Sequence, residues 1–385
     1  MKQRLKSSLA LLATLALAVS LFLIPSGAAT AVTDEASLRS AVAAGGAITM
    51  SNDITLTSAL DISKAVTIDG GTHALTYNVA TSAAITVSTN AQVTMKNLTL
   101  NATASGGRGI DLTGSSPHLT LTNTTLKVHT HGICFTQSGD ATGARVILGN
   151  SKILNSQVSG SYDTDTSIGN TRGISLYNTK NCQINILNGS EIKGFGYSIN
   201  LTGTDDANGV CDFEGTTVRV ENSSIFGWTA FNVWSAHTIF NITNSHLRGI
   251  NPSSSYSNSF ATIVVNDDIY GYFEGSHADA CKFNISGGTI DNHVTGSCDE
   301  YLFRIDDYGV TKATFSNNVK LVDNTNALPC AFVAGNQEPT QAFYNYVYNQ
   351  DGSDRILGAN TGCTSYYGNG ALLPLALLPS ASLRS

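Results

Sequence analysis

The stretch "VTMKNLTL" at 93–100 returns, with substitutions, as "LTLTNTTL" at 119–126, "VILGNSKI" at 146–153, "VRVENSSI" at 218–225, "FNITNSHL" at 240–247 and "FNISGGTI" at 283–290. Each copy alternates apolar and polar residues, has Asn or Gly at its fifth position and closes on an apolar residue. Looser copies place the same Asn or Gly at 52, 70, 188 and 317, so nine steps cover 265 residues, a mean of about 29. Alternation with period two predicts a short strand, and the Asn or Gly predicts a tight turn after it.

A second strand pattern lies between copies of the first. It reads "GIDLTGS" at 109, "GICFTQS" at 132, "GISLYNT" at 173, "SINLTGT" at 198, "AFNVWSA" at 230, "TIVVNDD" at 262 and "LFRIDDY" at 302. Such strands bury their apolar faces only when successive repeats stack. The strict hexapeptide period of left-handed β-helices is absent. The sequence therefore predicts an all-β fold, a right-handed parallel β-helix of about ten coils, roughly 45 to 50 Å long at ~4.8 Å per coil.

The repeated Asn has a structural role in this interpretation. Its tolerance of left-handed backbone suits a turn just past a strand, and stacked amides can hydrogen-bond along the axis as a ladder. Several of these residues form Asn-x-Ser/Thr sequons, which we interpret as ladder positions and not as glycan acceptors. The predicted ladder comprises Asn97, Asn123, Asn150, Asn188, Asn222, Asn244 and Asn317.

The segment "TDEASLRSAVAAGG" at 33–46 predicts a short amphipathic helix. Thr33 is the expected N-cap and Gly45 the expected end, and Leu38, Ala41 and Val42 share one face. A stack of coils needs a cover over its open apolar end. We expect this helix to be that cover at the N-terminal end.

The chain divides into five expected segments: a secretory signal peptide at 1–31, the cap helix at 32–46, the β-helix at 47–335, a C-terminal capping region at 336–370 and a flexible tail at 371–385. Basic residues precede an apolar run from Leu9 to Ile24, as in a cleaved signal. Ala29-Thr30-Ala31 offers one cleavage site and Ser26-Gly27-Ala28 another. The expected product is secreted, with any association with a cell surface non-covalent, because no sortase-type motif is present.

Composition excludes several partners. Charged residues are 13% of the chain, about half the usual share, and the formal net charge is -7. Without a basic cluster downstream of the leader, nucleic acid and anionic membrane surfaces are poor partners. No later apolar stretch approaches ~18 residues, so we expect no membrane insertion after cleavage. We expect a monomer.

The cap, the alternating strands and the Asn column resemble the pectate-lyase-like β-helix superfamily over about residues 33–335. More narrowly, "AVAAGGAITMSNDITLTSALDISKAVTIDGG" at 41–71 looks like the start of pectate-lyase-like adhesive modules of Gram-positive surface proteins. The resemblance implies the fold, which lyases, hydrolases and adhesins share. Similar pectate lyases carry R-x-P-x-x-R, and similar polygalacturonases carry N-T-D, D-D, H-G and R-x-K in that order. This chain has no R-x-P-x-x-R segment. Its H-G, at His131, precedes every acidic pair and no R-x-K follows, so the order of the polygalacturonase motifs is absent as well.

Strand parity places a candidate glycan site on the second strand of each repeat. Pairs such as Ile174/Leu176 and Phe231/Val233 point inward, so alternate residues, among them Cys134, Ser175, Val264 and Thr202, should face solvent. Aromatic rings for stacking, amides for hydroxyls and an Arg for a carboxylate suit a saccharide. The candidate residues are Tyr177, Asn200, Asn232, Trp234, Asn266, Arg304 and Asp306. The expected function is a secreted, non-catalytic adhesin or polysaccharide-binding protein that contacts extracellular polysaccharide or host glycan.

Acidic pairs in the adjoining turns leave three alternatives open. The residues are Asp205, Asp206, Asp267, Asp268, Asp306 and Asp307. They can be ordinary turn residues, Ca²⁺ ligands at Asp267 and Asp306, or paired catalytic carboxylates. Catalysis would make the chain a polysaccharide lyase or glycoside hydrolase acting on uronate-containing polysaccharide. A purely structural surface component is a third function class. No cofactor is required, and calcium is the one open alternative.

Cysteine and histidine add little chemistry. Seven Cys leave one unpaired, and Cys182 and Cys281 have the inward parity of core residues. Cys298, Cys330 and Cys363 are the disulfide candidates. His129 and His131 have a spacing that zinc could use on one strand, but a surface pair is the preferred interpretation because no third ligand is evident.

Overall fold

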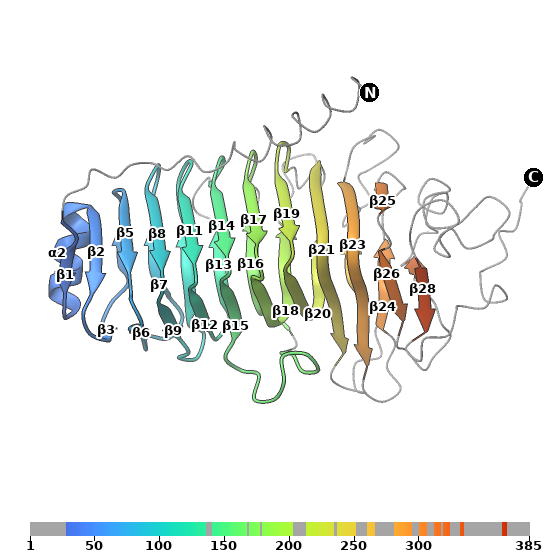
Figure 1. Cartoon of the computed structure of the whole chain (residues 1–385), viewed down its shortest axis with the longest axis horizontal. Coiled ribbons are helices and arrows are strands. Elements are labelled where there is room, and N and C mark those ends of the chain that lie inside the picture. The colour runs from blue at the N-terminus through green and yellow to red at the C-terminus, as the bar shows by residue number, and fades with distance from the viewer. Residues whose placement is uncertain are drawn as a thin grey trace, which may run out of the picture.

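The computed structural model describes residues 28–135, 141–167, 169–177, 179–202, 213–234, 237–251, 260–265, 281–294, 300–305, 312–316, 319–323, 332–334 and 364–367. Its described strands pair in parallel and stack along one axis, as Figure 1 shows. The fold is a parallel β-helix, which confirms the expected class. Residues 1–27 of the expected signal peptide, most of the C-terminal capping region, the tail and Asn317 lie outside the described residues.

Each coil contributes strands to three faces. Face 1 begins at β1 (Thr30–Val32) and continues, strand over strand, through β2 (Gly46–Met50), β5 (Val66–Asp69), β8 (Gln92–Lys96), β11 (His118–Thr122), β14 (Arg145–Gly149), β17 (Gln183–Leu187), β19 (Thr217–Glu221), β21 (Thr238–Asn251), β23 (Cys281–Val294) and β25 (Lys312–Ser316).

Face 2 follows each face 1 strand around a corner. It contains β3 (Ile54–Leu56), β6 (Ala74–Tyr77), β9 (Thr99–Ala102), β12 (Thr125–Val128), β15 (Lys152–Asn155), β18 (Glu191–Thr202), β20 (Ser224–Val233), the later parts of β21 and β23, β26 (Lys320–Asp323) and β28 (Thr364–Tyr367).

Face 3 completes the coil. Its strands are β4 (Leu60–Ile62), β7 (Ala83–Val87), β10 (Arg108–Leu112), β13 (His131–Phe135), β16 (Arg172–Tyr177), the later parts of β18 and β20, β22 (Phe260–Val265), β24 (Glu300–Ile305) and β27 (Phe332–Ala334). These ten described strands, one per coil, match the expectation of about ten coils.

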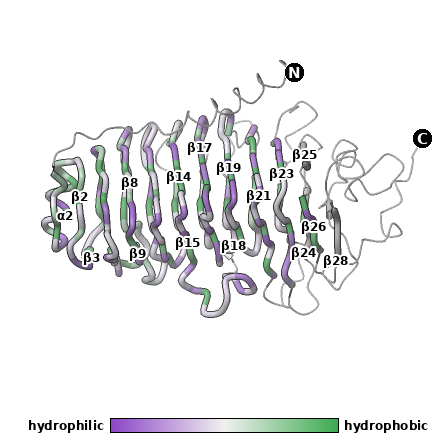
Figure 2. The backbone as a smooth tube through the Cα atoms, in the orientation of Figure 1, coloured by the Kyte–Doolittle hydropathy of each residue, from purple (hydrophilic) through white to green (hydrophobic). Residues whose placement is uncertain are grey.

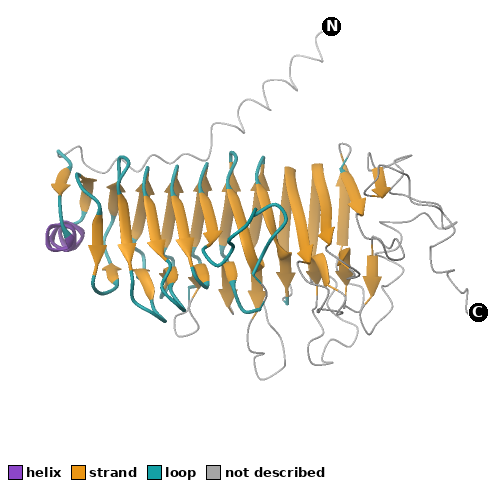
Figure 3. Ribbon diagram, turned by 90° about the horizontal axis from the view of Figure 1, so that it is seen from below, coloured by secondary structure: helices purple, strands orange, loops and turns teal. Residues whose placement is uncertain are grey.

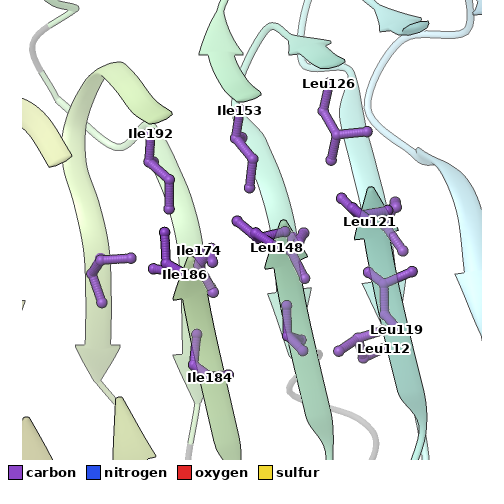
Figure 4. Close-up of a cluster of buried hydrophobic side chains, with 14 of the residues drawn as sticks. Leu112, Leu119, Leu121, Leu126, Leu148, Ile153, Ile174, Ile184, Ile186 and Ile192 are labelled. Carbon is purple, nitrogen blue, oxygen red and sulfur yellow. The ribbon is translucent and has the colours of Figure 1, made fainter. Parts of the chain in front are cut away.

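The core is a continuous apolar column inside the coils. Inward residues stack on equivalent residues of the next coil, for example Leu121 over Leu148 and Ile174 over Ile199. All four are fully buried. Figure 4 shows such Leu and Ile side chains from neighbouring coils in contact with one another, and Figure 2 shows hydropathy alternating along the strands. The inward parity expected from the sequence is confirmed on face 3, as is the burial of Cys182 and Cys281.

The Asn turn between faces 1 and 2 has the conformation and the bonds expected of it. Asn97, Asn123 and Asn150 have positive φ values of 55°, 49° and 49°. The side-chain amide of Asn150 donates to Oδ1 of Asn123 (2.8 Å), and that of Asn123 to Oδ1 of Asn97 (3.2 Å). Asn97 in turn donates to Oδ1 of Asp69 (3.1 Å). Asn188, Asn222 and Asn244 share the left-handed backbone.

A second polar column at this corner was not predicted. It is formed by the Ser or Thr that stands one or two positions after the Asn, and these residues are buried inside the turn. Oγ of Ser151 accepts from the backbone N–H of Thr124 (3.1 Å) and donates to the carbonyl of Gly149 (3.0 Å). In the next coil, Oγ of Ser190 accepts in the same way from the backbone N–H of Ser151 (3.1 Å). The hydroxyls therefore satisfy backbone groups that the turn leaves unpaired.

The N-terminal cap is the helix α2 (Glu35–Ala44), seen at the β1 end of the stack in Figure 3. Leu38, Ala41 and Val42 are buried, as expected, and Gly45 ends the helix with φ 86°. The predicted N-cap was wrong by one residue. Asp34, and not Thr33, accepts from the backbone N–H of Ser37 (2.8 Å), because its carboxylate completes a reciprocal capping box with the Ser37 hydroxyl. Among the described residues no helix is long and apolar enough to span a bilayer.

Substitution of Asn123 separates the two contributions of the Asn turn. Asn123→Gly keeps the positive φ but loses two side-chain bonds, so we expect a loss of about 1 kcal/mol in the free energy of unfolding. Asn123→Ala adds the left-handed backbone cost, for a total of about 2 kcal/mol or more. Chemical denaturation of both variants measures the difference, and equal losses would contradict a role for the backbone conformation.

Strand β1 distinguishes the two candidate cleavage sites. Thr30 pairs with Ile48 and Val32 with Met50, and Val32 is fully buried. Cleavage after Ala31 would remove most of this strand, whereas cleavage after Ala28 would keep it whole. We therefore expect a mature chain that begins at Ala29, as intact-mass analysis would show. A mature chain that begins at Val32 would contradict this prediction.

Candidate functional site

The candidate site is the outer surface of face 3, where the sequence predicted it, and it consists of three columns of side chains. Equivalent positions of successive coils lie one above another, at ~4.8 Å intervals. The polar column is Asp111, Cys134, Ser175, Asn200 and Asn232. The basic column is Arg108, His131 and Arg172. The aromatic column is Tyr177, Thr202 and Trp234, in three consecutive coils.

The polar column corrects one expectation. Ser175, Asn200 and Asn232 were expected to face solvent, yet they are 1%, 1% and 7% exposed, and Val264 in the next coil is also buried. They point away from the core but bond to one another. The amide of Asn200 donates to Oγ of Ser175 (3.4 Å), and that of Asn232 to Oδ1 of Asn200 (2.8 Å). This chain of bonds makes the column a rigid support and leaves few groups free for a ligand.

The support ends on Trp234. Its indole N–H donates to Oδ1 of Asn232 (2.9 Å), and its backbone N–H donates to the carbonyl of Leu201 (2.8 Å). The ring is part-exposed, as is Tyr177 two coils earlier. Two coil steps separate these rings by about 10 Å along the axis. The structure therefore brings Trp234 and Tyr177 onto one surface, as the sequence predicted, while Asn232 and Asn200 in the adjacent column are buried.

The basic column was missed, because it breaks strand parity. Arg108, His131 and Arg172 each precede a glycine within their strand, namely Gly109, Gly132 and Gly173. A Cβ on Gly109 would lie 2.4 Å from the carbonyl oxygen of Gly132, so only glycine fits between these coils. The basic residues occupy inward positions by parity, but their side chains lie beside the polar column on the outside. The signal was available in the sequence, as the basic residue before each glycine.

The three basic residues have different electrostatic surroundings. Arg108 is neutralised, since its guanidinium donates to both carboxylate oxygens of Asp111 (2.5 and 3.3 Å). His131 has a pKa lowered to about 4, first by burial and then by Arg172 and Arg108, so it is neutral at pH 7. Nδ1 of its ring is buried without a hydrogen-bond partner. Burial also lowers the pKa of Arg172, while Cys134, Tyr197 and Tyr177 act in the opposite direction and raise it.

Cys134 and the histidines do not form a metal site in the described part of the chain. Burial, with Asp111 nearby, raises the pKa of Cys134 to about 11, which keeps its thiol protonated. His129 lies at a turn, where its Nδ1 accepts from the backbone N–H of Gly106 (3.2 Å), and His131 is the first residue of β13. The expectation that both histidines lie on one strand was therefore wrong. Among the described residues no three His, Cys, Asp or Glu side chains gather around a point that could hold a metal.

Several predicted site residues lie outside the described part of the chain. They are Asn266, Asp306, Asp205, Asp206, Asp267, Asp268 and Asp307. Calcium binding and catalysis by the acidic turns therefore stay as predictions. For Arg304 the structure gives the backbone register, with Arg304 paired to Val264 on β22 and thus in line with the polar column.

A second cluster, on face 2, is fully paired. Arg248 donates to both carboxylate oxygens of Asp291 (2.9 and 2.7 Å) and to the carbonyl of Asp163 (2.9 Å). Lys193 binds the Asp163 carboxylate (2.9 Å) and lies over the ring of Phe226, 4.4 Å from its centroid. These contacts hold the insertion 156–171, which extends beyond the strands in Figure 1, across three coils. We interpret the cluster as a structural strap.

His131 makes the stability depend on pH in a defined window. The unfolded chain takes up a proton on this residue below about pH 6.5, and the folded chain only near pH 4. The free energy of unfolding that comes from keeping His131 neutral is therefore fully present above about pH 6.5, and it is lost as the pH falls toward 4. Because glutamine cannot titrate, His131→Gln should lose less stability than the wild type between pH 7 and 4.5. Melting temperatures at both pH values measure this, and equal losses would contradict the prediction.

The comparisons with known proteins add no family assignment. No family model matches the chain, and no curated protein or solved structure matches it.

Proposed function

We propose that this chain is a secreted, non-catalytic protein that binds extracellular polysaccharide or host glycan on face 3. One observation carries the proposal: the Trp234 ring is part-exposed while its indole N–H is fixed to a buried chain of hydrogen bonds that runs through Asn232 and Asn200 to Ser175. Aromatic rings held at the edge of a polar support suit the apolar faces of sugar rings, with little ordering cost on binding.

The repetition of the surface favours a polymer as ligand. Tyr177 and Trp234 are two coils apart, and the columns between them run parallel to the helix axis. A chain of sugar units lying along that axis would meet equivalent positions at regular intervals. The backbone of this surface is paired on both sides by neighbouring strands, so the site is preorganised.

The resemblance to the pectate-lyase-like superfamily, and to its Gram-positive adhesive modules, supports the same proposal. The corner ladder from Asp69 to Asn150 and the helix cap belong to the features on which the resemblance was based. An adhesin would be secreted and would act as a monomer at or near a cell surface. No membrane insertion or cofactor is part of this proposal.

Retention on immobilised polysaccharides, with and without Ca²⁺, tests the proposal. We expect the mature protein to be retained on at least one polymer without releasing new reducing ends or unsaturated products. Trp234→Ala should weaken retention at least tenfold, because it removes the stacking ring. The control is Ile239→Ala, which removes an exposed apolar side chain from face 1.

The outcomes separate three functions. Retention that both variants share would show that face 3 is not the binding surface. Product formation would make the chain a lyase or hydrolase and would direct attention to the acidic turns. Absence of both retention and products on every polymer would leave the purely structural function.

A further inference from the structure

Arg172 differs from the other arginines whose side chains the structure describes. Arg39, Arg108, Arg219 and Arg248 each bind a carboxylate, and Arg145 is exposed to water and bonded to Gln183. Arg172 is half-buried, and within the described part of the chain it meets no carboxylate. A half-buried charge without a counterion is costly, and a protein keeps such a group for function more often than for stability.

The hydrogen bonds of Arg172 leave capacity for a ligand. Its Nη2 donates to Oδ1 of Asn170 (3.1 Å), and its Nη1 makes only a 3.5 Å contact with Oγ of Ser175. Its Nε is buried without a partner. An arginine fork suits two oxygens of one planar or tetrahedral anion, such as a carboxylate or a sulfate.

His131 adds a second group to the same place. His131 on β13 is the register partner of Arg172 on the neighbouring strand β16. Nδ1 of its ring is also buried without a hydrogen-bond partner. In the next coil the same register position holds Tyr197, and Tyr177 lies at the end of the Arg172 strand. The basic column and the aromatic column thus lie on the same face, with Ser175 of the polar column between Arg172 and Tyr177.

We propose that Arg172 and His131 form a site for an anionic group, a carboxylate or a sulfate ester, carried by the bound glycan. This inference rests on the proposed function and specifies the ligand class for the same surface. Trp234 and Tyr177 contact the sugar rings, and Arg172 selects polymers that carry negative charge. The chain itself is acidic, so a local cationic site and not long-range attraction provides this selection.

Binding of the anion is linked to protonation of His131. The charged groups that face this ring are Arg108 from β10 and Arg172 from β16, with Asp111 bound to Arg108 and the neutral thiol of Cys134 on its own strand. An anion at Arg172 offsets the repulsion of the two guanidiniums and raises the pKa of His131. Affinity should therefore rise as the pH falls toward 4, the pKa of His131 in the free protein. A carboxylate loses its charge near pH 4, whereas a sulfate ester does not.

The experiment compares Arg172→Gln with Arg145→Gln, which removes the same charge from face 1. Probes are polygalacturonate, its methyl ester, dextran sulfate and dextran. We expect Arg172→Gln to weaken binding of polygalacturonate or dextran sulfate at least tenfold and to leave the neutral polymers unchanged. Arg145→Gln should change each affinity less than twofold. Thermal melting controls for folding, and Arg172→Gln should melt at or above the wild-type temperature, because it removes a half-buried charge that no described carboxylate neutralises.

A second measurement uses the wild-type protein without any polymer. Inorganic sulfate should raise the pKa of His131, followed by NMR of its ring protons, and the rise should be absent in Arg172→Gln. If sulfate leaves that pKa unchanged and Arg172→Gln binds charged polymers like the wild type, the anion site is overturned while glycan binding stands. If no polymer binds but sulfate raises the pKa, the anion site stands and the proposed function fails.

Discussion

The whole structure depends on the parallel register between coils. Because each strand pairs in parallel with the equivalent strand of the next coil, every side chain lies over its own counterpart at ~4.8 Å. A residue type suits a column only if it tolerates a copy of itself as neighbour. Apolar side chains do, and so does asparagine, whose amide is both donor and acceptor. This requirement explains why Leu121 stacks on Leu148 and why Asn150 bonds to Asn123.

Like charges do not satisfy that requirement, which makes the basic column informative. Arg108, His131 and Arg172 follow one another in three coils, and the fold compensates them unequally. Asp111 neutralises the first and the second stays uncharged at pH 7, whereas no described carboxylate neutralises the third. The amide columns contrast with this. The hydrogen-bonded column of Asn side chains at the corner ends on Asp69, and its residues hold the left-handed backbone of the turns. The polar column of face 3 ends instead on the part-exposed Trp234.

Sequence periodicity predicted what repeats in every coil, and it failed where single coils differ. Strand parity correctly placed Ile174 and Phe231 inside, because that rule depends on the backbone alone. It did not predict the burial of Asn200, which depends on the neighbouring Ser175 and Asn232 in space. It also missed Arg172, whose guanidinium lies beside Ser175 of the polar column although parity assigns position 172 to the inside. The N-cap was misplaced because Thr33 and Asp34 are both good caps, and only the Ser37 bonds distinguish them.

The strap from Asp163 to Lys193 and Arg248 has a consequence for unfolding. In a solenoid each repeat contacts only its neighbours, so stability behaves as a one-dimensional sum and the ends can fray independently. The strap begins after β15 yet binds β18 and β21, and so joins coils that are not adjacent. Coils between these points cannot open singly without breaking the Arg248 contacts. The middle of the molecule therefore unfolds as one cooperative block, and amide hydrogen exchange would show it as a plateau of uniform protection between more labile coils.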